Sequence, residues 1–164
     1  MSTPAELKRK FFKALASDKT MMLGLVGLED SNARPMTAQI EGEEGPIWFF
    51  SSTESNLVKQ LAESDIGFAT FVSKNQDLYA SVNGLLVLDN NKSMIDALWN
   101  PFVAAWYEGG KDDPKLALLR FDLDNGEIWL DGSSIIAGIK MLLGADPKQE
   151  YKANVAEVNF GHTS

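Results

Sequence analysis

The chain has 164 residues, of which 45% are hydrophobic and 23% charged, as expected for one soluble globular domain. It contains no cysteine, which excludes disulfides, thiolate metal sites and cysteine nucleophiles and fits a reducing cytoplasm. The formal net charge of −8 disfavours nucleic-acid binding, and no apolar run approaches the length that spans a membrane. We therefore expect a cytoplasmic protein without a nucleic-acid or membrane partner.

The first third of the chain predicts one helix followed by a meander of strands. Thr3 is a typical N-cap and Pro4 a typical first helical residue, and the helix should end near Asp18. Connections as short as those that follow favour antiparallel neighbours. Strands separated by short polar turns are expected over residues 20–28, 34–40 and 47–51.

The rest of the chain predicts further helices and strands, with a tight hairpin near residue 125. Asp124-Asn125-Gly126 is a strong turn signal and predicts that the strands on either side of it form the hairpin. Helices are indicated over residues 55–64, 92–99, 102–107 and 133–143. Strands are indicated over residues 66–73, 78–88, 116–123, 127–130 and 153–160.

These elements favour a mainly β protein of the α+β type. About seven short strands occur in antiparallel runs rather than in alternation with helices, which disfavours a doubly wound sheet. A closed or partly closed barrel with peripheral helices would cover the strand edges. We assign the barrel and its N-terminal helix to residues 1–145, and a C-terminal tail that adds a short strand to residues 146–164.

A candidate site for an aromatic phosphate lies in the first third of the chain. Arg34 offers a guanidinium fork that matches phosphate oxygens, and the aromatic run that ends at Phe50 offers a flat apolar platform. The hydroxyl residues Ser51, Ser52 and Ser55 come at the start of a predicted helix, where free N–H groups favour an anion. Together these residues predict a site for a planar phosphate ligand.

Each of these residues also has a simpler structural explanation. Arg34 could pair with Glu41 or Glu43, the aromatic side chains could fill a core or an interface, and the serines could cap a helix. The combination favours a ligand, whereas no single residue does.

The sequence offers little catalytic chemistry of its own. Its single histidine, His162, has no second histidine or cysteine with which to form a catalytic triad or a zinc site. We assign no catalytic residue and no metal ligand, and any redox reaction would rely on a cofactor.

Four segments of the chain carry a family signature. They are Arg34-Pro35-Met36, Trp48-Phe49-Phe50-Ser51-Ser52, Ser81-Val82-Asn83-Gly84, and the tryptophan-rich residues 99–114, which end in Gly109-Gly110-Lys111-Asp112-Asp113-Pro114. These segments resemble the general stress proteins, a branch of the pyridoxamine phosphate oxidase-like, flavin-binding split barrels. The similarity covers residues 5–145, and the tryptophan-rich segment separates this branch from the oxidases of vitamin B6.

The resemblance implies an antiparallel split β-barrel of the FMN-binding type that forms a homodimer. FMN, or in some members FAD, would be bound in clefts between the two barrels. The implied cofactor-binding residues are Arg34, Ser51, Ser52 and Ser55 for the phosphate, Met36, Thr37 and Phe50 for the isoalloxazine ring, and Trp106 or Trp129 from the other subunit.

The chain departs from the family at one position of this implied phosphate site. The family usually carries a phosphate-binding lysine after the hydroxyl strand, and the aligned residue here is Leu57. Lys59 lies about 200° around a helix from Leu57 and is not an easy substitute. Loss of one charge-assisted contact costs about 1.5–3 kcal/mol, so flavin binding would be weak or lost.

Three functions fit the sequence. The leading one is a general stress-type flavin-binding protein, with weak flavin-dependent oxidoreductase activity as an open question. Leu57 favours an alternative in which the dimer has kept the fold, lost the ligand and serves as a structural or interaction protein. The third, a pyridoxamine phosphate oxidase-like enzyme, needs basic residues for a substrate phosphate, for which the tail offers only Lys148, Lys152 and His162.

Overall fold

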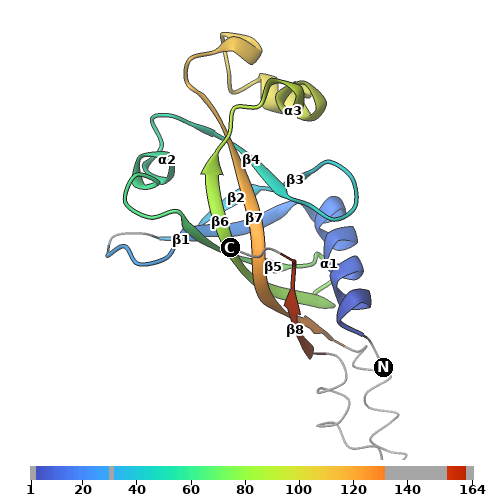
Figure 1. Ribbon diagram of the computed structural model, residues 1–164. Helices are drawn as coiled ribbons and strands as arrows, with labels where there is room; N and C mark the ends of the chain where they lie inside the picture. Colours follow the sequence, from blue (N-terminus) through green and yellow to red (C-terminus); the bar gives the residue numbers. More distant parts are fainter. Residues whose placement is uncertain (1–2, 30–31, 132–154, 162–164) are drawn as a thin grey trace, which may run out of the picture.

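The computed structural model describes residues 3–29, 32–131 and 155–161, which form an antiparallel barrel with helices at its edges (Figure 1). The helices are α1 (Pro4–Asp18), α2 (Asn56–Gln60), α3 (Lys92–Leu98), α4 (Pro101–Ala104) and the 3-10 helix η1 (Gly110–Asp112). The strands are β1 (Thr20–Leu25), β2 (Arg34–Thr37), β3 (Gln39–Ile40), β4 (Ile47–Ser52), β5 (Ile66–Val72), β6 (Leu78–Leu88), β7 (Leu116–Leu130) and β8 (Val155–Asn159).

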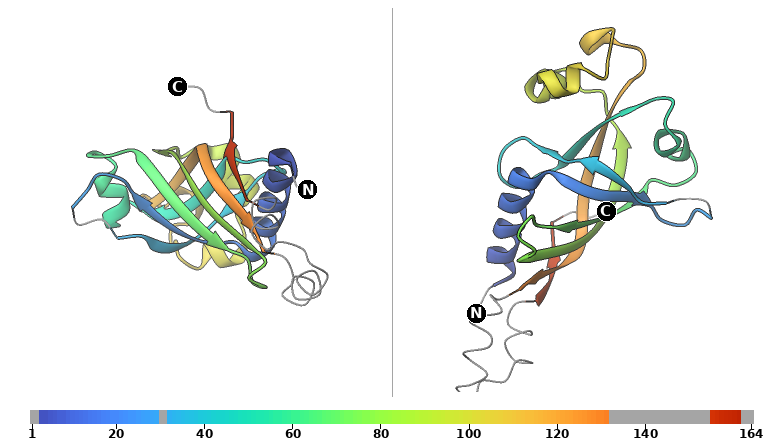
Figure 2. Two further views of the ribbon diagram at one scale, coloured as in Figure 1. Left: turned by 90° about the horizontal axis from the view of Figure 1, so that it is seen from below. Right: turned by 180° about the vertical axis from the view of Figure 1, so that it is seen from behind.

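The chain itself closes the barrel. The strands form one sheet in the order β2-β1-β5-β6-β7-β4-β3, with β8 added to β7. The two ends of this order, β2 and β3, are consecutive in the chain and separated only by the buried residue Ala38, whose N–H donates to the carbonyl of Lys19 at 2.6 Å. The single strand predicted over residues 34–40 is therefore wrong, because the chain bends at Ala38 from one edge of the sheet to the other. The predicted mainly β barrel is confirmed (Figure 2).

Helix α1 supplies part of the barrel core. Its N-terminus is capped as predicted, since the N–H of Glu6 donates to Oγ1 of Thr3 at 3.2 Å. Leu7, Phe11 and Leu15 recur every four residues and are fully buried against the strands. Each such side chain contributes about 1.5–3 kcal/mol of burial free energy, so the helix is held to the barrel by this stripe.

The predicted hairpin around Asp124-Asn125-Gly126 is wrong, because β7 runs without a break through these residues. The β6–β7 register shifts between Asn83 and Gly84, where β7 carries an extra residue. A Cβ on Gly84 would lie 2.0 Å from the carbonyl oxygen of Asp122, and one on Gly126 would lie 2.4 Å from that of Ser81. These glycines therefore permit a close approach of two strand backbones, and the polar residues beside them mark a bulge rather than a turn.

A second hydrophobic cluster, here called the outer cluster, forms where α3 and α4 cover the outside of β4 and β7. Its side chains are Trp48, Phe50, Met94, Ile95, Leu98, Trp99, Val103, Tyr107, Leu116 and Leu118. The predicted interruption at Asn100-Pro101 is confirmed, since Asn100 is extended and its side chain caps α4 by accepting from the N–H of Val103 at 3.0 Å. This break turns residues 101–107 over the end of β4.

Other boundaries differ modestly from the prediction. The first strand ends at Leu25 and α2 ends at Gln60, both shorter than expected, whereas β6 has the predicted bounds and β8 confirms a strand in the tail. The predicted helix over residues 133–143 and the boundary at residue 145 lie outside the described residues. Among the helices that the structure describes, none combines the length and apolar composition needed to cross a membrane.

Candidate functional site

A cleft of about 750 Å³ opens between β2, the end of β4 and α4. It exists because the barrel is split there. Among the described strands, β3 pairs with only Ile47 and Trp48 of β4, while β7 pairs with the whole length of β4 from Ile47 to Ser52. The last residues of β4 thus have a strand on one side and the cleft on the other. We call this the β2–β4 cleft.

The walls of the cleft differ in chemistry. One part is apolar and aromatic and is formed by Met36, Phe50, Phe102, Val103 and Trp106. The other part carries hydroxyl groups, those of Thr37, Ser51, Ser52 and Ser55. Such a cavity, largely apolar with a few converging polar groups, is typical of a small-molecule site.

The hydroxyls of Ser52 and Ser55 accept from nearby backbone N–H groups, and the serines still have protons to donate. Oγ of Ser55 accepts from the N–H of Val58 at 3.2 Å and lies 3.1 Å from Oγ of Ser51, and Oγ of Ser52 accepts from the N–H of Glu54 at 3.1 Å. A hydroxyl has one donor and two acceptor positions. The Ser51–Ser55 pair uses one of its two protons internally, so one proton of the pair and the proton of Ser52 remain for a ligand.

Tyr107 connects the outer cluster to the hydroxyl wall. Its hydroxyl donates to the carbonyl oxygen of Ser51 at 2.5 Å. Its ring lies 6.3 Å from that of Phe50 and 6.1 Å from that of Trp99, and only 8% of the residue is exposed. Burial raises the pKa of Tyr107 to about 12, with a smaller contribution from the negative charge of Asp113. The phenol therefore stays protonated and able to donate at any physiological pH.

Asp113 shapes the loop behind this tyrosine. Its carboxylate accepts from the N–H of Lys115 at 2.9 Å and from that of Gly109 at 3.0 Å. These two backbone donors, Lys115 first, lower the pKa of the carboxyl group. Asp113 is thus a turn residue, as its position before Pro114 suggests.

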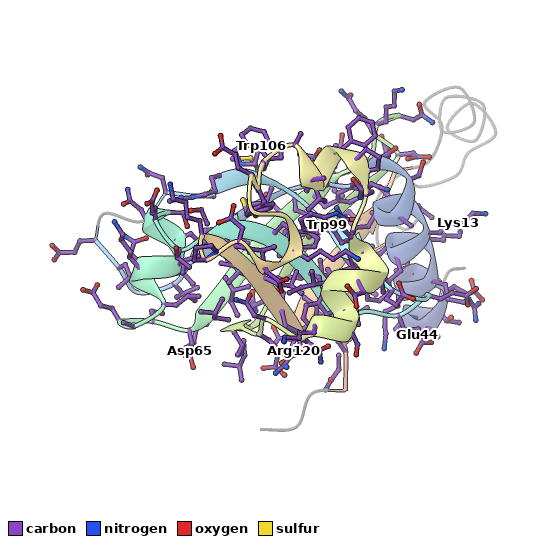
Figure 3. The ribbon with its side chains drawn as sticks, turned by 90° about the horizontal axis from the view of Figure 1, so that it is seen from above. Lys13, Glu44, Asp65, Trp99, Trp106 and Arg120 are labelled. Carbon is purple, nitrogen blue, oxygen red and sulfur yellow. The ribbon has the colours of Figure 1, made fainter. Side chains whose placement is uncertain are left out.

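Two aromatic side chains stand exposed on α4 and beside it. Phe102 is 85% exposed and Trp106 is 84% exposed, and both line the cleft. Figure 3 looks down on this end of the molecule and shows Trp106 at the rim, whereas Trp99 lies further inward beside the helices. Large apolar side chains this exposed are typical of a surface that contacts a ligand or another protein.

Six of the seven cofactor-binding residues expected from the chain itself line the β2–β4 cleft, and Arg34 lies outside its lining. The six are Met36, Thr37, Phe50, Ser51, Ser52 and Ser55. The resemblance implies Trp106 or Trp129 from the other subunit, whereas Trp106 lines the cleft of its own chain and Trp129 does not.

Arg34 lies on β2 next to residues that do line the cleft. It is half-buried, and in the described part of the chain neither Glu41 nor Glu43 forms an ion pair with it. The alternative that assigned Arg34 to such a pair is therefore wrong. Pro35 and Met36, its neighbours on the strand, both line the cleft.

Trp129 lies on a different surface, the outer side of β5, β6 and β7. The register places Val72, Tyr79, Trp129 and Val155 in one row across four strands. These side chains line a cavity of about 460 Å³. We call this surface the sheet face and define it by the apolar row and by Thr70 and Ser81, which border it.

Sequence reasoning missed the other residues that line the cleft, namely Lys19, Pro35, Gln39, Asn100, Phe102, Val103 and Tyr107. Phe102 and Trp106 are four residues apart, and this spacing could have placed them together on one side of a helical turn. Lys19 has no such signal, because it reaches the cleft only through the pairing of β1 with β2.

Leu57, at the position of the family lysine, is 1% exposed and packs in the barrel core. Its side chain therefore points away from any ligand in the cleft, and the departure from the family is structural as well as chemical.

The barrel, its split and the adjoining cleft define a split-barrel protein. The sequence matches the family described as pyridoxamine 5'-phosphate oxidase like over residues 6–152, and no curated protein matches it significantly. The chain belongs to this pyridoxamine 5'-phosphate oxidase-like family.

Solved structures show which branch of the family is involved. A general stress family protein from Xanthomonas campestris pv. campestris is 58% identical, with a TM-score of 0.75 over 81% of this chain and 92% of the other. The general stress FMN/FAD binding protein of Xanthomonas citri is 57% identical, with a TM-score of 0.74 over 79% of this chain and 92% of the other. The predicted membership of the general stress branch is confirmed.

A more distant structure shows the same fold over more of the chain. A general stress protein 26 from Jannaschia sp. CCS1 is 24% identical, with a TM-score of 0.75 over 96% of this chain and 99% of the other.

Proposed function

We propose that the protein binds a flavin, FMN or FAD, in the β2–β4 cleft. The observation that carries the proposal is the convergence on one cleft of six residues that the family resemblance implies from the same chain, beside the aromatic side chains of Phe102 and Trp106. The Xanthomonas citri relative, which is described as an FMN/FAD binding protein, supports the same ligand class.

The residues present fit the two ends of a flavin. An isoalloxazine ring is flat and largely apolar, and Phe50, Trp106 and Met36 offer surfaces against which such a ring can pack. A phosphate needs hydrogen-bond donors, and the free protons of the Ser51–Ser55 pair and of Ser52 are donors of this kind.

Positive charge at the site has to come from residues other than the family lysine. Leu57 is buried, so we consider Arg34, which is next to the cleft residue Pro35 on β2, and Lys19, which lines the cleft. Arg34 is assigned to the phosphate, because a guanidinium group binds phosphate oxygens in a bidentate manner. With one charge-assisted contact fewer than the family pattern, the affinity should lie one to two decades below that of members with the lysine.

A bound flavin would supply electron-transfer chemistry, and we propose weak oxidoreductase activity on that basis. The side chains of this protein hold and orient the ligand. Phe102 and Trp106 would shield the ring from water, and the serine hydroxyls would hold the phosphate end.

We further propose that the protein works as a homodimer. On the sheet face, Val72 is 49% exposed and Tyr79 is 37% exposed, and both lie in the apolar row with Trp129. The family resemblance implies the homodimer, and we propose that a second copy of the chain covers this row.

The test is an absorption spectrum of the protein as purified, followed by thermal unfolding with and without added FMN. We expect flavin bands, or a melting temperature that rises with FMN, because ligand at a hundred times its dissociation constant stabilises the fold by about 2.7 kcal/mol. A colourless protein whose melting temperature does not change at millimolar FMN or FAD would overturn the proposal.

A second candidate is a ligand-free interaction dimer, and the buried Leu57 favours it. The two functions differ in what Arg34→Ala does. A flavin protein should lose measurable FMN affinity in this variant, whereas a ligand-free dimer has none to lose and should keep its oligomeric state.

A further inference from the structure

Tyr107 holds the end of β4 from outside the sheet. In the β4–β7 ladder Ser51 pairs with Ala117, and the N–H of Thr53 donates to the carbonyl of Lys115 at 2.9 Å, so the backbone groups of Ser51 face β7. The hydroxyl of Tyr107 adds a side-chain donor to the carbonyl oxygen of Ser51, a residue that β3 does not pair with. This contact ties the end of β4 to the outer cluster in addition to the strand ladder.

Tyr107 is held rigidly enough to act as a fixed support. Its ring is packed between Phe50 and Trp99 in the outer cluster, and its N–H donates to the carbonyl of Ala104 at 3.2 Å. The hydroxyl therefore has little freedom, and the Ser51 carbonyl that it binds is fixed relative to the outer cluster.

The same residue, Ser51, carries the hydroxyl that meets Ser55. A continuous set of contacts runs from the Tyr107 hydroxyl to the Ser51 carbonyl, and from Oγ of Ser51 to Oγ of Ser55, which is held by the N–H of Val58. One end of the hydroxyl pair is thus fixed by α2 and the other by Tyr107.

We infer that Tyr107 is a positioning residue that sets the Ser51 and Ser55 hydroxyls at the spacing at which they bind the phosphate of a flavin nucleotide. The inference rests on the proposed flavin function and assigns a role to a residue that does not itself need to touch the phosphate. It predicts a defect confined to the phosphate end of the ligand.

The experiment compares FMN with riboflavin, which has the same ring and no phosphate. The dissociation constants of both are measured by flavin fluorescence quenching for the wild type, Tyr107→Phe and the control Ser64→Ala, which removes a hydroxyl that donates to the carbonyl of Val26 at 2.8 Å, outside the lining of the cleft and of the sheet face. Tyr107→Phe should weaken FMN about tenfold and leave riboflavin unchanged, as expected for loss of one positioning hydrogen bond. Ser64→Ala should change neither constant.

Ser51→Ala provides a second, independent variant, since it keeps the carbonyl and removes only the hydroxyl. It should also weaken FMN selectively. The double variant with Tyr107→Phe should bind FMN as well as the single variant that loses more affinity, because both substitutions act on the same hydroxyl group. Additive losses would contradict the inference. So would equal weakening of FMN and riboflavin by Tyr107→Phe, or no change in either.

The two proposals fail in different ways. A wild-type protein that binds neither flavin overturns the proposed function and this inference with it. A wild-type protein that binds FMN more tightly than riboflavin, with a ratio that Tyr107→Phe leaves intact, overturns the inference alone.

Discussion

The β2–β4 cleft and the sheet face are two surfaces of one barrel, each with a tryptophan, and they differ in the polar groups beside it. The cleft places Trp106 opposite serine hydroxyls that retain free protons. The sheet face places Trp129 in a row with Val72, Tyr79 and Val155. A ligand with a phosphate needs the first kind of surface, whereas a second protein chain can be held by the second. The family resemblance implied one of the two tryptophans from the other subunit, and within a single chain only Trp106 lines the cleft.

Strand β7 carries Trp129 of the sheet face and pairs with β4, which lines the cleft, so the largest expected effect comes from damage to the pairing of β7 with β6. Gly84→Ala would place a methyl group 2.0 Å from the carbonyl oxygen of Asp122, which requires the backbones to separate. We expect a loss of about 3–5 kcal/mol in the free energy of unfolding, measured by urea denaturation, with both surfaces disturbed.

Gly42→Ala is the matched control. Gly42 has a φ of +92° but nothing within 4 Å of the added methyl group, so only backbone strain of about 1–2 kcal/mol is expected. Equal losses in the two variants would contradict the close approach of β6 and β7.

The alkaline limit of stability should depend on the cleft wall through Tyr107. Its pKa of about 12 in the folded protein exceeds the ordinary tyrosine value near 10, so the folded state keeps a proton that the unfolded state loses. Stability contributed by the neutral phenol is therefore full below pH 10 and is lost as the pH rises from 10 to 12, by about 2 kcal/mol in all.

Urea unfolding of the wild type and Tyr107→Phe between pH 8 and 12 checks this sign. The difference in unfolding free energy between the two proteins should shrink as the pH rises through this window. Tyr79→Phe, on the sheet face, should leave the alkaline loss in place. A wild-type and Tyr107→Phe difference that stays constant to pH 12 would argue against a buried, protonated phenol.

Removing each tryptophan in turn sharpens the comparison of the two surfaces. Trp106→Ala should weaken FMN binding about tenfold through lost ring packing, with little change in the melting temperature because its side chain is exposed. Trp129→Ala should shift the protein toward monomer in analytical ultracentrifugation and weaken FMN only to the extent that it dissociates the dimer, because Trp129 lies outside the cleft lining of its own chain. If the two variants exchange these effects, the assignment of ligand to cleft and partner to sheet face is reversed.

The smallest expected effect is a gain in FMN affinity. Asn56 is exposed beside Ser55, so Asn56→Lys adds a positive charge near the hydroxyl pair without burying it. We expect FMN affinity to rise about threefold to tenfold and riboflavin affinity to stay constant, measured by fluorescence titration at low salt. Asn75→Lys in the β5–β6 turn adds the same charge outside the cleft lining and should change neither constant.

The sequence predicted those parts of the fold that depend on local signals. Residues close together in the chain predicted the cap and apolar stripe of α1, the bounds of β6 and the break at Asn100. The hairpin at Asp124-Asn125-Gly126 was wrong for a physical reason, since the same residues suit a tight turn and a bulge. The bulge is distinguished from a tight turn only by the close approach of Gly84 to Asp122, which lie on strands far apart in sequence.

The residues of the candidate site also divide into those that local sequence signals predict and those that only the assembled fold reveals. Ser51, Ser52 and Ser55 could be found because they are close together in the chain and end a strand. Tyr107 could not, because its role depends on a hydrogen bond to a residue 56 positions away, across the outer cluster. Leu57 was recognised as a departure from the family, but its burial in the barrel core appears only once the strands are assembled.

The central claim is that the β2–β4 cleft holds the flavin, and the indole N–H signals of the protein test it most directly. The chain has four tryptophans, and single Trp→Phe variants assign their signals in a proton–nitrogen NMR spectrum. During titration with FMN the Trp106 signal should shift and saturate while the Trp129 signal stays in place. A Trp129 signal that shifts while Trp106 does not, or two signals that both ignore saturating FMN, would contradict the account.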